Sequence, residues 1–336
     1  MIRFLIPLSA LPLAATAEVP RVMTDIAPIH SLTAQVMGDL GTPELLLPPG
    51  ADPHDFALRP SDADALAQAD LVIWVGEGLT PWLEEPLTTL APQAEALELL
   101  AVPGWATLDT REEVHDDHGD DHGDDHGDEH ADEHDDDHAD DHAEEHGDEH
   151  GDEHADDHGH DHGDIDPHGW TDPQVAQVWV TAIAAALSEI DPENAATYAA
   201  NAMATRNTLS ALDAQIAESL TGLADRRYIL PHDGYQYFEV RYELQASAAI
   251  AGIDARNPGP AQISALRDRM AEEEIVCVFS DVEIGDRWAR LVTEGTAART
   301  TMLDAVGAEL TPGPALYEDM MIRLANAFVS CIGGDA

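Results

Sequence analysis

The sequence predicts an α/β protein with two lobes, each built on a parallel sheet and joined to the other by one long helix. Two observations lead to this fold class. Short apolar runs alternate with helical patterns in both halves of the 336-residue chain, which is the order expected of parallel sheets covered by helices. A helical pattern without a strong breaker separates the two halves, between residues 191 and 221. A chain of this length can bury the cores of two such lobes.

The first lobe is predicted over residues 18–190, with strands and helices in regular succession. The run LVIWVG is apolar throughout, as in a strand that is buried on both faces. The stretch PSDADALAQA begins with polar capping residues and therefore predicts a helix. In chain order the predicted elements are a strand at 19–25, a helix at 29–37, a strand at 43–48, a helix at 60–69, a strand at 71–76 and a helix at 171–190.

The linker helix is predicted over residues 191–221 and leads into a second lobe at 222–336. At ~1.5 Å per residue this helix would extend roughly 45 Å, which is long enough to reach both lobes. The predicted elements of the second lobe are a strand at 226–231, helices at 235–244 and 261–274, a strand at 275–280 and a final helix at 317–331. The alternation seen in the first lobe therefore returns after the linker.

A secretory signal peptide is predicted over residues 1–17. Arg3 is followed by a short apolar run and by small residues that end at Ala17, so cleavage is expected after Ala17. The apolar run is too short for a transmembrane helix, and Pro7 and Pro12 interrupt it. We therefore expect the mature protein to be exported and soluble.

Cys277 and Cys331 are the only cysteines of the chain. In an exported protein such a pair indicates a disulfide. The chain-entropy model gives a bridge of this span ~4 kcal/mol of stabilisation. Ligation of a metal by these residues is the alternative, but neither cysteine lies in a CxxC or CxxH pattern.

Residues 112–164 form an acidic, histidine-rich insertion within the first lobe. The chain has a net charge of −52, and residues 109–166 carry −28 of it, with 29 Asp or Glu against one basic residue, Arg111. Without an apolar period, and with recurrent Gly and dense like charge, the insertion is predicted to be disordered. The strong negative charge argues against nucleic acid or anionic membranes as partners and favours cations. Eleven histidines of the insertion recur at every fourth residue: His118, His122, His126, His130, His134, His138, His142, His146, His150, His154 and His158.

Four histidines lie outside the insertion: His30, His54, His168 and His232. His30 is interpreted as a residue of a helix start. Each of the other three has Asp or Pro beside it, and His54 and His232 follow predicted strands. In open α/β sheets, ligands bind beyond the carboxyl ends of the strands. Three imidazoles presented there would suit Zn²⁺, which takes nitrogen ligands in tetrahedral geometry.

The motifs around these histidines resemble those of a known family. The segments ADPHDFALRPSD, DPHGWTDP and PHDGYQYF, with an acidic histidine-rich insertion between the first two, resemble the zinc-specific solute-binding proteins of bacterial ABC transporters, the ZnuA type of the metal-binding cluster A-I family. The resemblance implies two α/β lobes joined by a rigid helix, with a metal site in the interlobe cleft. It places the metal ligands on His54, His168 and His232, and the cysteine pair matches the disulfide of such zinc proteins.

The fourth position around the metal stays open. Some zinc members of the family carry Glu before the first histidine, where this sequence has Pro53. Related members use an Asp after the strand that matches IVCVFS, which makes Asp286 the first candidate, Asp281 the second and water the third. Manganese members replace the third histidine with Glu, so His232 favours zinc. Selectivity over Cu²⁺ and Ni²⁺ is left open, because imidazole binds those ions as well.

The function implied is a high-affinity periplasmic zinc-binding receptor that delivers Zn²⁺ to an ABC-type importer, with the insertion as an auxiliary zinc collector or sensor. The expected partners are the zinc ion, the membrane permease of the importer and, as a further candidate, a periplasmic metallochaperone; a monomer is expected. Two alternatives belong to other classes. One is a periplasmic zinc buffer or chaperone that acts through the insertion. The other is a zinc hydrolase, against which the absence of an HExxH motif counts.

Overall fold

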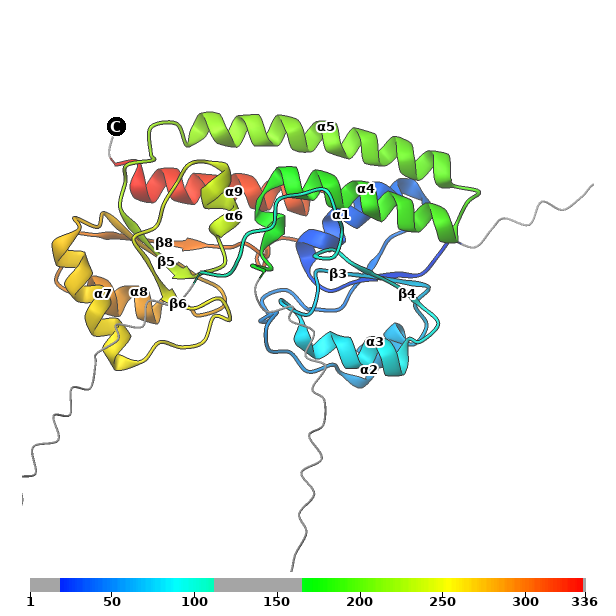
Figure 1. The fold of residues 1–336 in the computed structure, drawn as a ribbon, viewed down its shortest axis with the longest axis horizontal. Helices are drawn as coiled ribbons and strands as arrows, with labels where there is room; N and C mark the ends of the chain where they lie inside the picture. The colour runs from blue at the N-terminus through cyan, green and yellow to red at the C-terminus, as the bar shows by residue number, and fades with distance from the viewer. Residues whose placement is uncertain (1–18, 112–164, 335–336) are drawn as a thin grey trace, which may run out of the picture. The chain divides into compact units, whose positions relative to one another are not determined.

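The computed structural model of the protein describes residues 19–111 and 165–334, which belong to one compact unit. They form two four-stranded parallel sheets with helices packed around them (Figure 1). The fold class predicted from the sequence is therefore confirmed. The predicted signal peptide and the eleven regularly spaced histidines of the insertion lie outside the described residues.

The first sheet has the strand order β2-β1-β3-β4, and all its neighbouring strands are parallel. Its strands are β1 (Val22–Thr24), β2 (Glu44–Leu45), β3 (Leu71–Trp74) and β4 (Glu95–Glu98). Every residue of β1 and β3 is buried, because these two strands occupy the centre of the sheet. The elements that follow its strands are α1 (Ala27–Met37), η1 (Gly38–Leu40), α2 (Pro60–Leu66), η2 (Pro81–Leu83) and α3 (Glu84–Leu90).

The second sheet repeats this arrangement with the order β6-β5-β7-β8, again with all neighbours parallel. Its strands are β5 (Tyr228–His232), β6 (Ala248–Ala251), β7 (Cys277–Asp281) and β8 (Arg299–Leu303). The central strands β5 and β7 are buried along their whole length. The helices of this half are α6 (Gln236–Arg241), α7 (Pro260–Glu272), α8 (Arg287–Thr293) and α9 (Leu316–Ile332).

Two antiparallel helices connect the halves. After η3 (Gly169–Thr171), α4 (Pro173–Ile190) leads into α5 (Ala195–Ser219), which runs past both sheets in Figure 1. The linker helix was predicted from residue 191, but Asp191 instead forms a turn in which its carboxylate accepts hydrogen bonds from Asn194 Nδ2 and the Tyr198 hydroxyl, each at 2.8 Å. The 25 residues of α5 span about 38 Å, still long enough to contact both halves.

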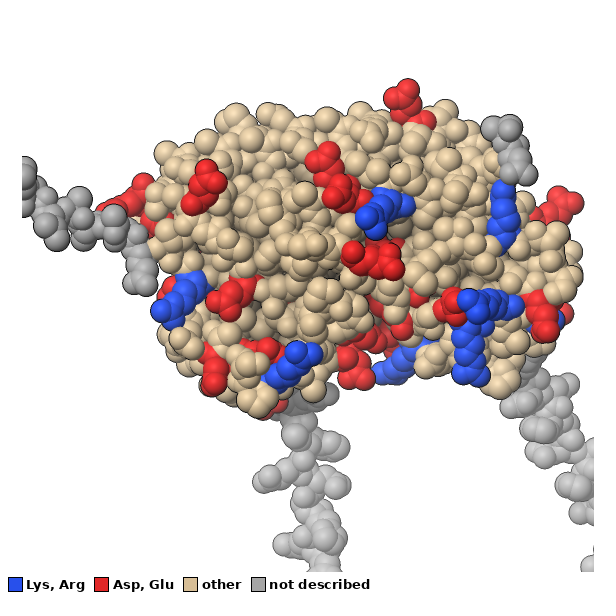
Figure 2. Space-filling view, turned by 180° about the vertical axis from the view of Figure 1, so that it is seen from behind, with Lys and Arg blue, Asp and Glu red and all other residues tan. Residues whose placement is uncertain are grey.

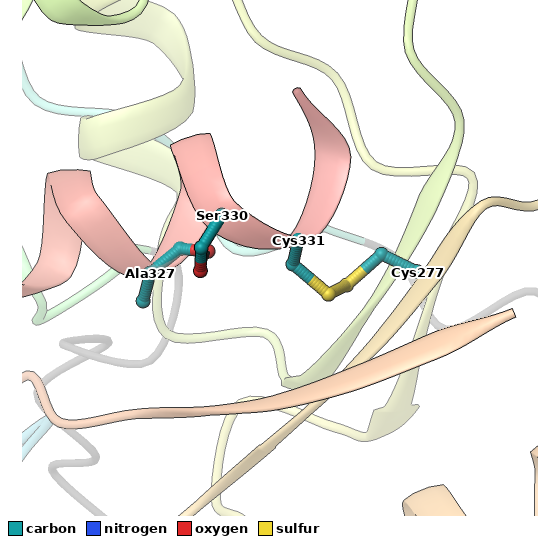
Figure 3. Close-up of a disulfide and its surroundings, with 4 residues drawn as sticks. All are labelled: Cys277, Ala327, Ser330 and Cys331. Atoms are coloured by element: carbon teal, nitrogen blue, oxygen red, sulfur yellow. Dashed lines mark hydrogen bonds between the residues drawn. A yellow bond between two sulfur atoms is a disulfide. The ribbon is translucent and has the colours of Figure 1, made fainter. Parts of the chain in front are cut away.

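The predicted disulfide between Cys277 and Cys331 is confirmed (Figure 3). It joins the first residue of β7 to the last turn of α9, with the two Cα atoms 5.7 Å apart. Both cysteines are fully buried, and next to the bridge the Ser330 hydroxyl donates to the Ala327 carbonyl at 3.0 Å. The bridge therefore fixes α9 to the strand that ends beside the candidate metal centre described below.

No helix among the described residues is long and apolar enough to cross a membrane. Three strands of the described residues, β4, β6 and β8, were not predicted from the sequence, and each is an edge strand of its sheet. The short helices α3 and α8 were also not predicted. These additions complete the two sheets without changing the predicted layout.

Candidate metal centre

Three elements bring His54, His168 and His232 together. His232 is the last residue of β5, His168 precedes η3, and His54 lies in the loop that follows β2. Their ligand atoms all lie within 4.8 Å of one another. His168 and His232 are 2% and 1% exposed, and His54 is partly buried. His30, in contrast, lies in α1 and its Nε2 is 3.0 Å from the Pro43 carbonyl oxygen.

The atoms that face this shared space lack hydrogen-bond partners. Within the part of the chain that the structure describes, Nε2 of His54, of His168 and of His232 are all buried and unpartnered. Oε2 of Glu283 is also buried without a hydrogen bond, and it lies 3.6 Å from His232 Nε2. Buried polar atoms are normally satisfied, so three imidazole nitrogens that converge, with a carboxylate oxygen beside one of them, indicate a ligand. Two ligands of one tetrahedral zinc ion are roughly 3.3 Å apart, so small movements suffice to complete the geometry.

Carboxylates orient two of the imidazoles. His168 Nδ1 is 2.9 Å from Asp166 Oδ1, and His232 Nδ1 is 2.6 Å from Asp281 Oδ2. When Nδ1–H donates to a carboxylate, the Nε2 lone pair is left free for a metal. Asp281 ends β7, the parallel neighbour of β5, so the sheet itself places this acid beside His232. The structure therefore places Asp281 behind an imidazole and not among the atoms that face the shared space.

The structure does not bring Asp286 to the cluster. Asp286 directly precedes α8, its side chain is 47% exposed, and its carboxylate pairs with Arg290 one helical turn away. Glu283, three residues earlier, lies beside the cluster instead, with its Oε2 3.6 Å from His232 Nε2. The same reasoning could have found it, because Glu283 lies two residues beyond the carboxyl end of the buried strand β7.

A tryptophan holds the loop that carries His54. The Trp82 indole N–H donates to the carbonyl of Pro53 at 2.8 Å, and the ring packs edge-on against Phe56 with centroids 5.2 Å apart. Within the loop, the His54 amide donates to Asp52 Oδ1 at 2.8 Å. Among the described residues, no carboxylate is hydrogen-bonded to the imidazole of His54, in contrast to the other two histidines. Its position therefore depends on the loop.

Gly234 leaves the space that a metal ion would need. A Cβ atom built on Gly234 would lie 2.1 Å from His232 Nε2 and 2.9 Å from His168 Nε2. Both separations are too short for non-bonded atoms, and the nearest atoms are the ligand nitrogens themselves. Glycine at this position therefore keeps the centre of the cluster open.

The electrostatics of the cluster differ between its members. Burial, together with the neighbouring imidazoles, holds the pKa of His54 well below its usual value. Burial also lowers the pKa of His168, although Asp166 opposes the shift. Burial favours a low pKa for His232 too, but the carboxylates of Glu283 and Asp281 outweigh it and raise the pKa to about 9. The cluster thus joins two neutral imidazoles to an imidazole that its neighbouring acids keep protonated, so a divalent cation displaces the His232 proton when it binds.

Hydrogen bonds across the halves fix the turn that carries His168. The Trp170 indole donates to the carbonyl of Ala305, which follows β8, at 2.7 Å. In return the Tyr317 hydroxyl of α9 donates to the Trp170 carbonyl at 2.7 Å. Trp170 is 1% exposed, and its ring lies against that of His168 with centroids 5.2 Å apart. The second half of the molecule therefore helps to position a histidine of the first.

Solved structures of metal-binding proteins share this fold. A crystal structure of a ZnuA deletion mutant with zinc bound matches with a TM-score of 0.71 and 19% identity, covering 95% of this chain and 100% of that one. The SBP FpvC from Pseudomonas aeruginosa in complex with Mn²⁺ matches with a TM-score of 0.70 and 20% identity, covering 94% and 98%. The fold of this chain is therefore the fold of these solved structures.

Sequence similarity then identifies the family. The family described as zinc-uptake complex component A, periplasmic (ZnuA), matches residues 22–331. The high-affinity zinc uptake system protein ZnuA of Paracoccus denitrificans is 46% identical over 328 residues, which cover 97% of this chain and 95% of that protein. The corresponding protein of Brucella abortus is 40% identical over 315 residues, covering 93% and 91%. The chain therefore belongs to the ZnuA family of solute-binding proteins, which are not enzymes.

Proposed function

We propose that this protein is a periplasmic receptor that captures Zn²⁺ at His54, His168, His232 and Glu283 and delivers it to an ABC-type importer. The observation that carries the proposal is the convergence of three buried, unpartnered imidazole nitrogens, with the unpartnered carboxylate oxygen of Glu283 3.6 Å from one of them, His232 Nε2. Three nitrogens and one oxygen form a donor set that zinc accepts in tetrahedral geometry.

The donor set also bears on the hydrolase alternative. Catalytic zinc sites keep three protein ligands and leave the fourth position to water or substrate. Here the carboxylate of Glu283 lies 3.6 Å from His232 Nε2, within reach of that fourth position. A zinc ion held by four side chains activates no water, so the arrangement favours binding and release over hydrolysis.

Delivery to an importer is supported by the family and by the names of the relatives, which are proteins of high-affinity zinc uptake systems. Accordingly the proposed partner is the membrane permease of such a system, and the proposed location is the periplasm after cleavage near Ala17. A monomeric state and transfer of zinc from a periplasmic metallochaperone remain predictions.

The histidine-rich insertion is proposed as an auxiliary collector of zinc. Its eleven evenly spaced histidines offer imidazole ligands for several ions. These residues lie outside the described part of the chain, so the proposal rests on their spacing alone. A zinc buffer that acts mainly through the insertion is the alternative, and the titration that ends the Discussion separates the two.

Zinc-limited growth tests the transport function. A bacterium that has the cognate permease but lacks its own zinc receptor would receive the wild-type protein, His232→Ala or the control Gly259→Ala. Gly259 precedes α7, and an added Cβ there would meet no atom within 4 Å. We expect the wild type and the control to restore growth in the presence of a zinc chelator, and His232→Ala to fail. Equal growth with His232→Ala would contradict the proposal.

A further inference from the structure

Arg111 bridges two acidic side chains next to the candidate metal centre. One guanidinium nitrogen forms an ion pair with Asp233 Oδ1 at 3.1 Å, without hydrogen-bond geometry, and the other donates a hydrogen bond to the carboxylate of Glu239 in α6. The side chains of Asp233 and Glu239 are 11% and 2% exposed, whereas that of Arg111 is 36% exposed. Asp233 directly follows His232, so the bridge acts on the residue after a proposed ligand.

The carboxylate of Glu239 is held in place by two further hydrogen bonds. Its Oε1 accepts hydrogen bonds from the Tyr228 hydroxyl and from the Ala246 amide, both at 2.6 Å. Tyr228 begins β5, and His232 ends the same strand. Arg111 therefore links Asp233, in the turn after β5, to Glu239, which is hydrogen-bonded to the first residue of β5. Both ends of the strand that carries His232 are thus connected through Arg111 and Glu239.

The chain segment that carries Arg111 is itself held against α6. The amide of Leu108 donates to the Tyr237 hydroxyl at 3.0 Å, and that hydroxyl donates to the carbonyl of Asp166 at 3.1 Å. The Asp166 amide donates in turn to the carbonyl of Leu108 at 2.8 Å. Because Asp166 orients His168, α6 is the common support of the segments beside His168 and His232. The guanidinium of Arg111 is thus held in place on both sides.

We propose that Arg111 is a positioning residue for metal binding, which fixes the turn His232-Asp233-Gly234 without contacting the metal. The inference rests on the proposed zinc-receptor function. It assigns a role to the single basic residue between positions 109 and 166 of the sequence. In this turn Gly234 passes close to two ligand nitrogens, so a small displacement of the turn would close the space for the ion.

Charge and position predict opposite effects for Arg111. If Arg111 acted only through its positive charge, its removal would make the site more negative and strengthen binding of Zn²⁺. If it positions the turn, its removal weakens binding. Arg111→Lys keeps the charge, but a single ammonium lacks the planar fork that joins two carboxylates. The charge account therefore predicts no change for Arg111→Lys, and the positioning account predicts weaker binding.

Arg241→Gln is the matched control. Arg241, the last residue of α6, is 29% exposed and forms a forked pair with Asp213 of α5, so it resembles Arg111 in exposure and pairing. Its ion pairs are with Asp213 and Asp172, and neither of these residues is a proposed ligand or belongs to the turn after β5. Comparing Arg111→Gln with Arg241→Gln therefore separates an effect on metal binding from a loss of folding stability that both variants would share.

Two measurements on the full mature chain test the proposal. Competition against a fluorescent chelator gives the affinity for the first equivalent of Zn²⁺. Hydrogen–deuterium exchange of the metal-free protein gives the protection of residues 232–238. We expect Arg111→Gln and Arg111→Lys to weaken zinc binding about tenfold, in the range known for residues that support metal ligands, and to increase exchange in this segment. Arg241→Gln should leave both quantities within twofold of the wild type.

Unchanged or stronger zinc binding in Arg111→Lys would overturn the proposal, and so would unchanged exchange of residues 232–238. Should Arg111→Gln fail to fold, Arg111→Lys decides alone. The exchange measurement needs no metal, so it tests the support of the turn separately from zinc binding. A wild type without a tight zinc site would count against the proposed function, while exchange would still show whether Arg111 fixes the turn.

Discussion

At the scale of single residues, the candidate metal centre is built from side chains that are distant in the sequence. His54, His168 and His232 could be named from their motifs and from the rule that ligands lie beyond strand ends. Glu283 was missed because the sequence does not reveal which acid of a loop points inward. Asp286 has the same chemistry, but it pairs with Arg290 on the surface. Which acid turns inward depends on how the loop after β7 folds.

The space at Gly234 gives the first prediction. Gly234→Ala should weaken zinc binding about a hundredfold or more, because its Cβ would lie 2.1 Å from His232 Nε2 and displace a ligand nitrogen. Competition with a fluorescent chelator measures this change. Gly259→Ala, where an added Cβ meets nothing within 4 Å, should bind zinc like the wild type. Equal affinity in both variants would show that the ion does not bind beside Gly234.

The choice between two acids of the loop after β7 gives the second prediction. Glu283→Gln should weaken zinc binding, since it replaces a charged ligand oxygen with a neutral one, by about tenfold or more. Asp286→Asn should leave the affinity unchanged, because its side chain is 47% exposed and paired with Arg290. Isothermal titration of the two variants compares them directly. A loss of affinity in Asp286→Asn alone would restore Asp286 as the ligand.

At the scale of elements, the central strands could be predicted and most of the outer ones could not. The strands β1, β3, β5 and β7 are buried along their whole length and appear in the sequence as apolar runs. The outer strands β4 and β8 consist mostly of exposed or partly exposed residues, and their sequences EALE and RTTML contain no apolar run. Such strands are defined by pairing with a neighbour, which local pattern does not reveal.

The start of α4 gives the third prediction. Asp172 caps this helix by accepting from the Gln174 amide at 2.7 Å, and burial raises the pKa of Asp172 from 3.8 to about 6. The folded state therefore binds the proton more tightly than the unfolded state. Its stabilising contribution is complete below pH 3.8 and is lost as pH rises through about 6.

Asp172→Asn keeps a capping oxygen and removes this titration. Relative to the wild type, its free energy of unfolding should rise by up to about 3 kcal/mol between pH 4 and pH 8. Urea denaturation of the metal-free proteins at both pH values measures the difference. Asp172→Ala should show the same change with pH but an added loss of about 1 kcal/mol at each, because it lacks the cap. A constant difference between Asp172→Asn and wild type would show that the carboxyl group titrates normally.

At the scale of the whole molecule, the two halves share one core and are joined by more than the linker. One cluster of buried residues includes Leu32 of α1, Leu209 of α5 and Phe328 of α9. The Tyr317 amide donates to the Ser31 hydroxyl at 3.0 Å, and that hydroxyl donates to the carbonyl of Pro314 at 3.1 Å. The proposed ligands from both halves are therefore held close together before metal arrives, which would lower the entropic cost of binding.

The charge distribution also favours a cation. The chain carries −52, of which −28 lies between residues 109 and 166. On the face turned away in Figure 1, the described part of the chain shows acidic side chains among separate Arg residues and no continuous basic patch (Figure 2). A negative field of this size attracts divalent cations and repels anionic partners. It raises the local concentration of the ion but does not create a tight site.

The central claim is that the tight zinc site is the cluster of dispersed histidines and not the insertion. The most direct test is a zinc titration against a competing fluorescent chelator. It compares the mature protein, a deletion of residues 114–163, and that deletion combined with His232→Ala. We expect the deletion to keep one tightly bound ion and His232→Ala to weaken it by about a hundredfold or more. Loss of tight binding with the insertion alone would contradict the account and indicate a zinc buffer built on that segment.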